Sequence, residues 1–310
     1  MFKKGFEFSF TWLFALSVGA IIIFLAIYAS RGLIKTGTEE YNTKVAAELG
    51  VLLNPIGTNL ESSKHYSLAL PEETRLFNDC SSDGAFGLQK LSVSVRSGIG
   101  QEWPKAGIPH KFANKYVFSQ HAVQGKELEL FVKPFNFPFK VGDLIILYST
   151  PFCFVAPPSD VEREVNFGDG ARYINVTTSK ENCPRGSVSV CFSGGTGCNI
   201  TVIMNQDGRS GRVMKQGQPL FYYDALLYGA IVADKETYDC QVARLMKRTA
   251  ELALLYAAKS ELLSSRGCSS GLEGDLRSYA QHLSSNNLPG LIIESETLER
   301  DNEKLTCGLF

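Results

Sequence analysis

The longest apolar segment of the chain lies close to its N-terminus. Residues Phe8 to Ala29 form a run of 22 positions without a charged side chain. As an α-helix this run measures roughly 33 Å, enough to cross a hydrocarbon layer about 30 Å thick. Trp12 and Tyr28 lie near its ends, where amphipathic rings favour the headgroup region. A cleaved secretory signal would have a shorter apolar core and a small-residue cleavage site, so the pattern predicts a transmembrane helix within residues 1–30.

Helical spacing of apolar residues continues beyond this segment. The apolar positions are Leu33, Tyr41, Val45, Leu49 and Leu52. Their spacings of 8, 4, 4 and 3 place them on one face of an α-helix, and the first proline of the chain is Pro55. The pattern therefore predicts an amphipathic helical stalk over residues 31–53, continuous with the membrane helix.

Strand patterns dominate residues 54–233. Leu91–Val95 and Glu127–Val132 alternate between apolar and polar residues, as half-buried strands do, whereas Leu144–Tyr148 is an apolar run typical of a central strand. Residues 187–192 and 199–204 flank a glycine-rich loop and predict a hairpin. With further turns at Asp207-Gly208 and Gln216-Gly217, residues 187–223 predict a meander of four strands and an antiparallel sheet.

The pattern becomes helical from Asp234 onward. Apolar residues at helical spacing predict a long helix that ends near Gly267, a second over about 271–285 and a third over about 292–306. The predicted fold class is therefore α+β, with four regions. These are the cytoplasmic tip and membrane helix (1–30), the stalk (31–53), an antiparallel β-rich extracellular domain (54–233) and a helical C-terminal segment (234–310).

The charge balance and the cysteine content limit the possible partners and cellular location of the protein. The 31 basic and 32 acidic residues give a net charge of −1, which leaves no basic excess for a nucleic-acid backbone. All eight cysteines follow residue 79, as expected of a region in an oxidising compartment. Asn175-Val-Thr and Asn199-Ile-Thr are N-glycosylation sequons. We therefore expect a single-pass protein of the cell membrane, with a cytoplasmic N-terminus and the bulk of the chain outside.

The cysteine spacings favour disulfides over a metal site. Cys183, Cys191 and Cys198 lack the C-x2-C pairs and the histidines of structural zinc sites, so they predict a disulfide that pins the hairpin. Cys240 and Cys268 would lie roughly 40 Å apart on a straight helix and could not bond with each other. One of them would therefore meet Cys307, and we favour Cys240–Cys307. Eight cysteines allow 105 connectivities, so the full set stays open.

Catalytic motifs are not found in the sequence. The four histidines are isolated, and neither H-E-x-x-H nor G-x-S-x-G occurs. The glycine-rich stretches 168–170 and 194–197 lack a P-loop lysine and predict turns. Phenylalanines 131, 135, 137 and 139 share one parity, which favours same-face core packing over a sugar-binding platform. We predict no catalytic residues, no metal and no cofactor.

Residues Lys3-Lys4-Gly5-Phe6 precede the apolar run closely. This motif resembles the processing site of type IV prepilins and archaeal class III signal peptides. The resemblance covers about the first 50 residues and implies a cut between Gly5 and Phe6. It also implies that the apolar segment stays attached as the first half of a long helix with a β-rich head. Glu7 would be the second mature residue, and Phe10 would occupy the fifth position, where the family usually has an acidic residue.

These observations predict a non-enzymatic, membrane-anchored structural or assembly protein, pilin-like in layout. Its expected partners are membrane lipid and other envelope or pilus-like subunits, and nucleic acid is not among them. One alternative is a surface-anchored binding module, for example for glycans. An anchored hydrolase is a further alternative.

Overall fold

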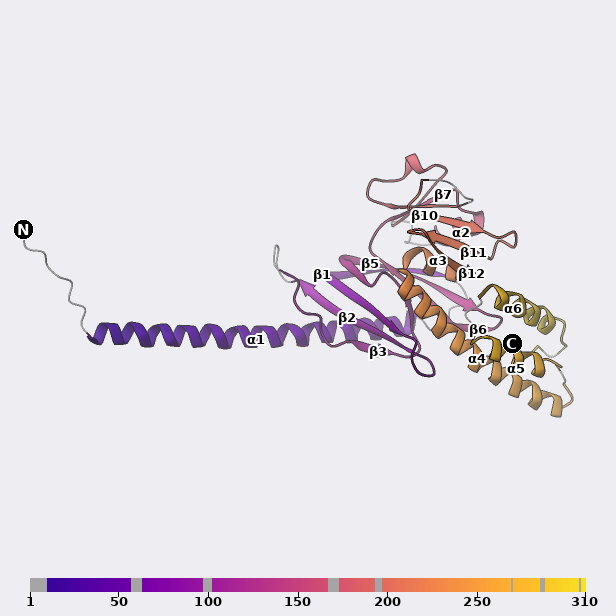
Figure 1. The fold of residues 1–310 in the computed structure, drawn as a ribbon, viewed down its shortest axis with the longest axis horizontal. Helices are drawn as coiled ribbons and strands as arrows, with labels where there is room; N and C mark the ends of the chain where they lie inside the picture. Colours follow the sequence, from indigo (N-terminus) through magenta and orange to yellow (C-terminus); the bar gives the residue numbers. More distant parts are fainter. Residues whose placement is uncertain are drawn as a thin grey trace, which may run out of the picture.

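The computed structural model describes residues 10–56, 63–96, 102–166, 173–192, 197–268, 270–284, 288–306 and 308–310. One long helix extends from a body that contains two β-sheets and several helices (Figure 1). The chain therefore has an N-terminal apolar helix, a β-rich body and C-terminal helices, as the sequence predicted in outline.

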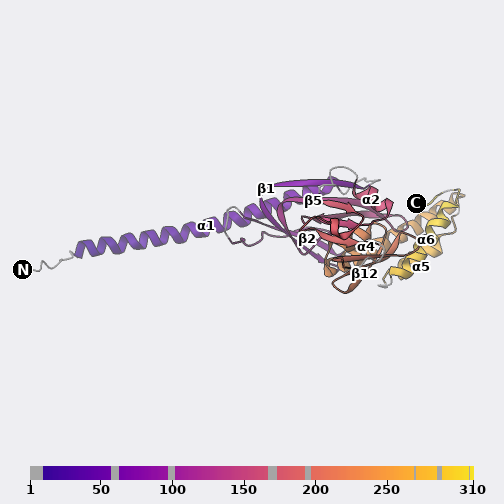
Figure 2. The same cartoon turned by 90° about the horizontal axis from the view of Figure 1, so that it is seen from above.

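Helix α1 (Phe10–Ile56) is a single helix of 47 residues. Its first half lies away from the body, and its second half lies along the body (Figures 1 and 2). Ala46 and Leu49 are buried there, and the buried Asn42 accepts a hydrogen bond from the Val95 amide at 3.1 Å. The predicted continuity of the two helical segments is confirmed. The part beyond Asn42 is packed on the sheet and is not a free stalk.

The first sheet, sheet A, has the strand order β3-β2-β1-β5-β6-β4. Its strands are β1 (Lys64–Ser81), β2 (Leu88–Arg96), β3 (His110–Phe112), β4 (Tyr116–Phe118), β5 (Ala122–Asn136) and β6 (Lys140–Tyr148). Every pairing is antiparallel except β4 with β6. Buried side chains from five of the strands share one core cluster: Leu76, Leu91, Val117, Leu130 and Ile145. Sheet A therefore curls around this cluster, and α1 covers it with Ala46 and Leu49.

The second sheet, sheet B, has the order β12-β11-β10-β9-β7-β8. Its strands are β7 (Phe152–Val155), β8 (Ile174–Thr177), β9 (Val188–Cys191), β10 (Ile200–Met204), β11 (Ser210–Lys215) and β12 (Gln218–Tyr223). Strands β10, β11 and β12 form an antiparallel meander, with Gly208 and Gly217 at positive φ in its turns. The pairings β8–β7, β7–β9 and β9–β10 are parallel.

Two predictions about sheet topology are therefore wrong. The sheets are mixed, and residues 187–204 do not form an antiparallel hairpin, because Val190 pairs with Ile200 and Cys191 with Thr201 in parallel. Alternation of apolar and polar residues is the same in either direction, so the pattern could not distinguish the two. The bond between Cys191 and Cys198 also returns the chain beside the end of β9, where β10 starts in the same direction.

Five helices follow or interrupt the strands. They are α2 (Ser159–Val165), α3 (Leu226–Val232), α4 (Lys235–Ser265), α5 (Glu273–His282) and α6 (Leu288–Glu303), and a short 3-10 turn covers Lys180–Asn182. The three predicted C-terminal helices are confirmed as α4, α5 and α6. Helices α2 and α3 were not predicted. Every residue of α3 is buried and apolar, and a seven-residue apolar run cannot be told from a central strand by periodicity.

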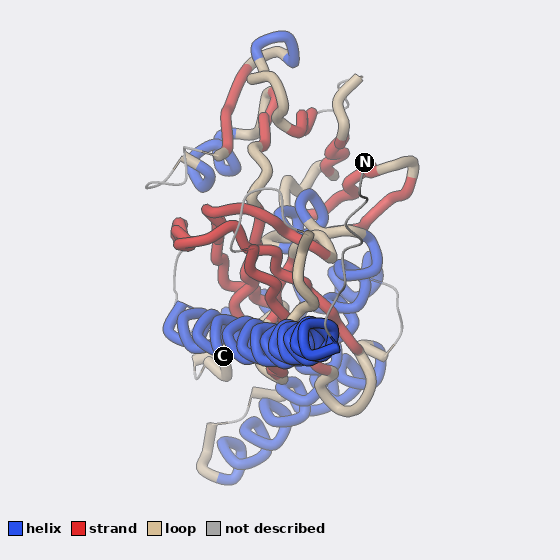
Figure 3. The backbone as a smooth tube through the Cα atoms, turned by 90° about the vertical axis from the view of Figure 1, so that its left-hand side faces the viewer, coloured by secondary structure: helices blue, strands red, loops and turns tan. Residues whose placement is uncertain are grey.

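The main core lies between the two sheets and the helices. It contains Phe131, Phe135, Phe137 and Phe139, as well as buried residues of α2, α3, α4, α5 and α6. The prediction that these phenylalanines are same-face core residues is confirmed, because each is at most 3% exposed. In the view from the N-terminal side, the strands lie behind and above α1, with helices on either side of them (Figure 3). Sheet A therefore has one face toward α1 and the other toward this main core.

Candidate functional site

The first half of α1 is an unusual surface for a folded protein. Residues Phe10–Ala29 have a mean hydropathy of 2.5, and none of this segment is buried against the body. Phe24, for example, is 69% exposed. Within the described residues it is the one helix long and apolar enough to cross a membrane. Contiguous apolar surface of this size marks a region that another apolar phase covers.

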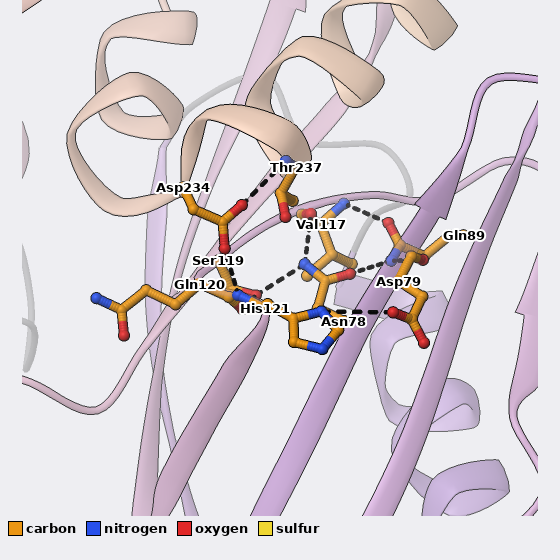
Figure 4. Close-up of polar contacts among 9 residues, drawn as sticks. All are labelled: Asn78, Asp79, Gln89, Val117, Ser119, Gln120, His121, Asp234 and Thr237. Atoms are coloured by element: carbon orange, nitrogen blue, oxygen red, sulfur yellow. Dashed lines mark hydrogen bonds and ion pairs between the residues drawn. The ribbon is translucent and has the colours of Figure 1, made fainter. Parts of the chain in front are cut away.

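A buried polar cluster closes the curl of sheet A. Asn78 of β1 donates to the carbonyl oxygen of Val117 in β4 at 3.0 Å, and the Val117 amide donates to Gln89 Oε1 of β2 at 3.3 Å. Gln241 of α4 donates to the same Val117 oxygen at 3.1 Å. We call Asn78, Gln89, Val117, Gln241 and Arg244 the seam. Part of it is drawn in Figure 4.

Arg244 is the most heavily bonded member of the seam. Its side chain is fully buried, and it donates to the carbonyl oxygens of Lys115 at 2.8 Å, Ala113 at 2.9 Å and Phe86 at 3.2 Å. It also donates to Gln241 Oε1 at 2.8 Å. A buried guanidinium is tolerated when its donors are satisfied in this way. One side chain of α4 therefore joins the loop before β2 to the segment between β3 and β4.

A disulfide fixes the same helix to the same sheet. Cys80 of β1 is bonded to Cys240 of α4, across a sequence separation of 160 residues. Cys240 precedes Gln241 directly, and Asn78 lies two residues before Cys80. The covalent bond and the hydrogen bonds of the seam therefore hold α4 at one position on sheet A.

A surface cavity of about 440 Å³ lies at the outer end of the seam. Its walls include His121, Lys215, Asp234 and Glu236. Asp234 caps α4 by accepting from the Thr237 amide at 3.0 Å, and it also accepts from the His121 amide at 2.6 Å (Figure 4). Burial lowers the pKa of Lys215, whose ammonium group donates to carbonyl oxygens at the end of α3, those of Val232 at 3.3 Å and of the following Ala233 at 2.8 Å. Asp234 and Lys215 of this cavity therefore cap helices.

The histidine of this cavity has an acidic neighbour. His121 Nδ1 lies 3.4 Å from Asp79 Oδ1, and both side chains are about half exposed or more. General-base catalysis would require a nucleophile within reach of the imidazole. Ser119, which is bonded to the seam, is fully buried, accepts from Asn78 at 2.7 Å and donates to the Gln120 carbonyl oxygen at 2.7 Å. Because both of its hydrogen-bonding roles are occupied, Ser119 is not poised for nucleophilic attack.

A second groove, of about 380 Å³, lies between β12, α4 and α6. Its walls are mostly apolar and include Phe221, Val242, Met246 and Leu291. The hydroxyl of Tyr238 reaches across it to the Phe221 carbonyl oxygen at 2.6 Å. Among the described residues, no cluster of histidine, cysteine and carboxylate side chains has the form of a metal site in this groove or elsewhere.

The predicted cysteine pairs need correction at one position. Cys183 is bonded to Cys153, and Cys191 is bonded to Cys198. The preferred pair Cys240–Cys307 is wrong, because Cys240 is bonded to Cys80. The prediction used distances along one helix and had no means of placing β1 beside α4. Cys268 is disulfide-bonded as well, and Cys307 lies outside the described residues.

The other predicted site residues fall in different places. Asn175 lies on β8, at the edge of sheet B, and Asn199 is exposed immediately before β10. Gly5 and Phe6 lie outside the described residues.

Neither the seam nor the cavity was predicted from the sequence. The signal available was the placement of polar residues Thr237, Gln241 and Arg244 on one face of α4, all of them buried. The sequence does not tell a buried polar face from a solvated one.

No protein-family model, curated protein or solved structure matches this chain.

Proposed function

We propose that this chain is a membrane-anchored structural protein of the outer cell surface, built to take part in an envelope assembly. The observation that carries the proposal is α1. Its first 20 described residues are apolar and unburied, and the same helix continues without a break into contacts with the body. An anchor continuous with the body holds that body at a defined distance and orientation from the bilayer.

The disulfides support an outward orientation of the body. Three pairs are formed among the described cysteines, from strands, loops and α4. Such bonds persist in oxidising compartments and are rare where thiols are kept reduced. One of these bonds, Cys80–Cys240, holds α4 on sheet A together with the seam.

The layout also supports the pilin-like version of the proposal. A long N-terminal helix whose apolar first half leads into a β-rich head agrees with what the Lys3-Lys4-Gly5-Phe6 motif implies. The body differs from the β-rich head that the motif implies, because α4, α5 and α6 add a helical segment to it. The glycan-platform alternative loses its aromatic face, because the four phenylalanines that suggested it are in the core.

Anchoring is tested by placing charge in the middle of the apolar segment. On insertion scales one lysine at the centre of a membrane helix costs roughly 2.5–3.5 kcal/mol, so Ile21→Lys combined with Leu25→Lys should release the chain from carbonate-washed membranes. Leu262→Lys is the matched control, because Leu262 is an exposed apolar residue of the body. Retention of the double variant in the membrane, at the level of the control, would contradict the anchor.

Sidedness is tested with a membrane-impermeant maleimide on intact cells after mild reduction. Partly exposed Cys183 and Cys198 should be modified without lysis. If they react only after lysis, the body is not outside.

The pilin-like version makes a separate demand on the N-terminus, since a processed chain begins at Phe6. Recovery of chains that begin at Met1 from the membrane would rule out processing and leave the anchor intact.

A further inference from the structure

The two sequons are brought into register by sheet B. Asn175 of β8 pairs with Cys153 of β7, and Cys153 pairs with Ser189 of β9. Asn199 is joined to Ser189 by a hydrogen bond of 2.8 Å between the Ser189 hydroxyl and Asn199 Oδ1. Paired residues of neighbouring parallel strands point to the same face, about 4.8 Å apart. The two asparagines therefore flank one row across the sheet.

The two sequon threonines lie in the next row. Thr177 of β8 pairs with Val155 of β7, Val155 pairs with Cys191 of β9, and Cys191 pairs with Thr201 of β10. All four strands run in the same direction. The two Asn-x-Thr tripeptides are therefore parallel copies on one face of sheet B, three strands or roughly 14 Å apart.

This face is the outer face of sheet B. Ile174 and Val176, which alternate with Asn175 and Thr177, belong to or pack against the main core. The sequon side chains therefore point away from it, toward the small cluster formed by Cys153, Val155 and Cys191. That cluster is completed by Cys183 and Cys198 from the two disulfide-bonded loops. The sequons lie on either side of these loops.

The carboxamides are available for substitution. Asn199 is exposed, and its Oδ1 accepts from both the Ser189 amide at 3.0 Å and the Ser189 hydroxyl, which directs its Nδ2 away from the strand. Asn175 is partly exposed, and within the described residues its carboxamide has no hydrogen-bond partner. Neither nitrogen is held by the fold.

We propose that Asn175 and Asn199 form a paired N-glycosylation site, so that glycans cover the outer face of sheet B. In the transfer, Nδ2 forms a bond to the anomeric carbon of a lipid-linked glycosyl phosphate donor and loses a proton. The bond between that carbon and the phosphate oxygen breaks, and the lipid phosphate leaves. A separate membrane transferase supplies the donor. The inference rests on the outward orientation proposed above. Glycans on this face would prevent other subunits from packing against it.

The test is glycopeptide mass spectrometry of the full chain purified from the membranes of the organism that makes it. We expect a glycan on both peptides, one lost in Asn175→Gln and the other lost in Asn199→Gln. Thr177→Ser and Thr201→Ser should keep the glycans, whereas Thr177→Val and Thr201→Val should each remove one. Asn182→Gln is the matched control, because Asn182 is an exposed asparagine near this face but outside a sequon.

A second readout separates this inference from the orientation. Exposed Lys180 should react with an impermeant amine reagent on intact cells. If Lys180 is labelled and both asparagines are unmodified, the glycosylation site is wrong and the orientation stands. If Lys180 is protected until lysis and the asparagines are unmodified, both are wrong. A glycan on one asparagine alone would overturn the paired arrangement.

Discussion

The two sheets of the body are stabilised in different ways. Sheet A is covered on both faces, by α1 on one and by the main core on the other, and its closure depends on a buried polar seam and a disulfide to α4. Sheet B has a core on one face, and on the other it has two disulfide-bonded loops around Cys153 and Cys191. The bonds of sheet B join residues only 30 and 7 positions apart.

This difference separates global from local stabilisation. The link between sheet A and α4 connects parts of the chain that are distant in sequence, so it constrains the unfolded chain strongly. The two disulfides of sheet B close short loops, so they stabilise mainly the residues around them. We therefore expect changes at the seam to affect the whole body and changes on the outer face of sheet B to remain local.

The largest expected effect is the loss of the long-range disulfide. In the chain-entropy model, the bond across 160 residues contributes about 5 kcal/mol and the bond across 7 residues about 2.4 kcal/mol. Cys80→Ser with Cys240→Ser should therefore lower the free energy of unfolding about twice as much as Cys191→Ser with Cys198→Ser. Denaturant titration of detergent-solubilised protein, followed by circular dichroism, measures both. Equal losses would show that the seam holds α4 without the disulfide.

The next effect concerns the guanidinium of the seam. Arg244→Ala leaves the buried carbonyl oxygens of Phe86, Ala113 and Lys115 without their donor, so we expect a loss of about 4 kcal/mol. Arg244→Lys is the control, because one ammonium group can serve some but not all of these oxygens. It should fall between the wild type and Arg244→Ala. A loss below about 1 kcal/mol in Arg244→Ala would show that water replaces the side chain.

The contrast between the sheets also explains what the sequence could predict. Periodicity located the second half of α1, the strands at 91–95 and 127–132 and the helices after Asp234, because one face of each is apolar. Unbroken apolar runs located the first half of α1 and the strand at 144–148. It could not give the direction of β9 against β10, since alternation is identical in parallel and antiparallel strands. Nor could it predict α3, whose residues are all buried.

The seam was beyond sequence analysis for a different reason. Asn78, Gln89 and Gln241 are polar residues in apolar surroundings, and each looks like a solvated position until its partner is known. The pairing of Cys80 with Cys240 depends on the same unseen contact between β1 and α4. In contrast, the sequons were visible as motifs, but their common register on sheet B follows only from strand order.

A pH-dependent effect is expected at Asp143 of β6 in sheet A. Burial raises the pKa of Asp143 above its ordinary value of 3.8, and this outweighs the opposing effects of Lys140 and Lys115. Lys140 Nζ lies 3.2 Å from Asp143 Oδ1. A carboxyl whose pKa is higher in the folded state binds its proton more tightly there. Stability therefore falls as the pH rises from the ordinary carboxyl range through the raised pKa.

The substitution Asp143→Asn removes this loss of folding stability at higher pH. The variant should be more stable than the wild type at neutral pH, and the difference should shrink as the pH is lowered into the range where the wild-type carboxyl is protonated. Thermal unfolding between pH 4 and pH 8 measures the trend. Glu102→Gln serves as the matched control, because Glu102 is an exposed carboxylate. A variant less stable than the wild type at neutral pH would mean that the ion pair with Lys140 outweighs the cost of burial.

The smallest effect compares equivalent substitutions in the two sheets. Ile145 of β6 is fully buried in the cluster inside sheet A, whereas Ile203 of β10 is partly exposed and alternates with the core residue Val202. Loss of one buried methylene costs about 0.5–1.5 kcal/mol in a packed core. We therefore expect about 1 kcal/mol for Ile145→Val and less than about 0.5 kcal/mol for Ile203→Val, by denaturant titration. Equal costs would mean that the outer face of sheet B is covered by a packed partner in the purified protein, and the division between a globally and a locally stabilised sheet would not hold.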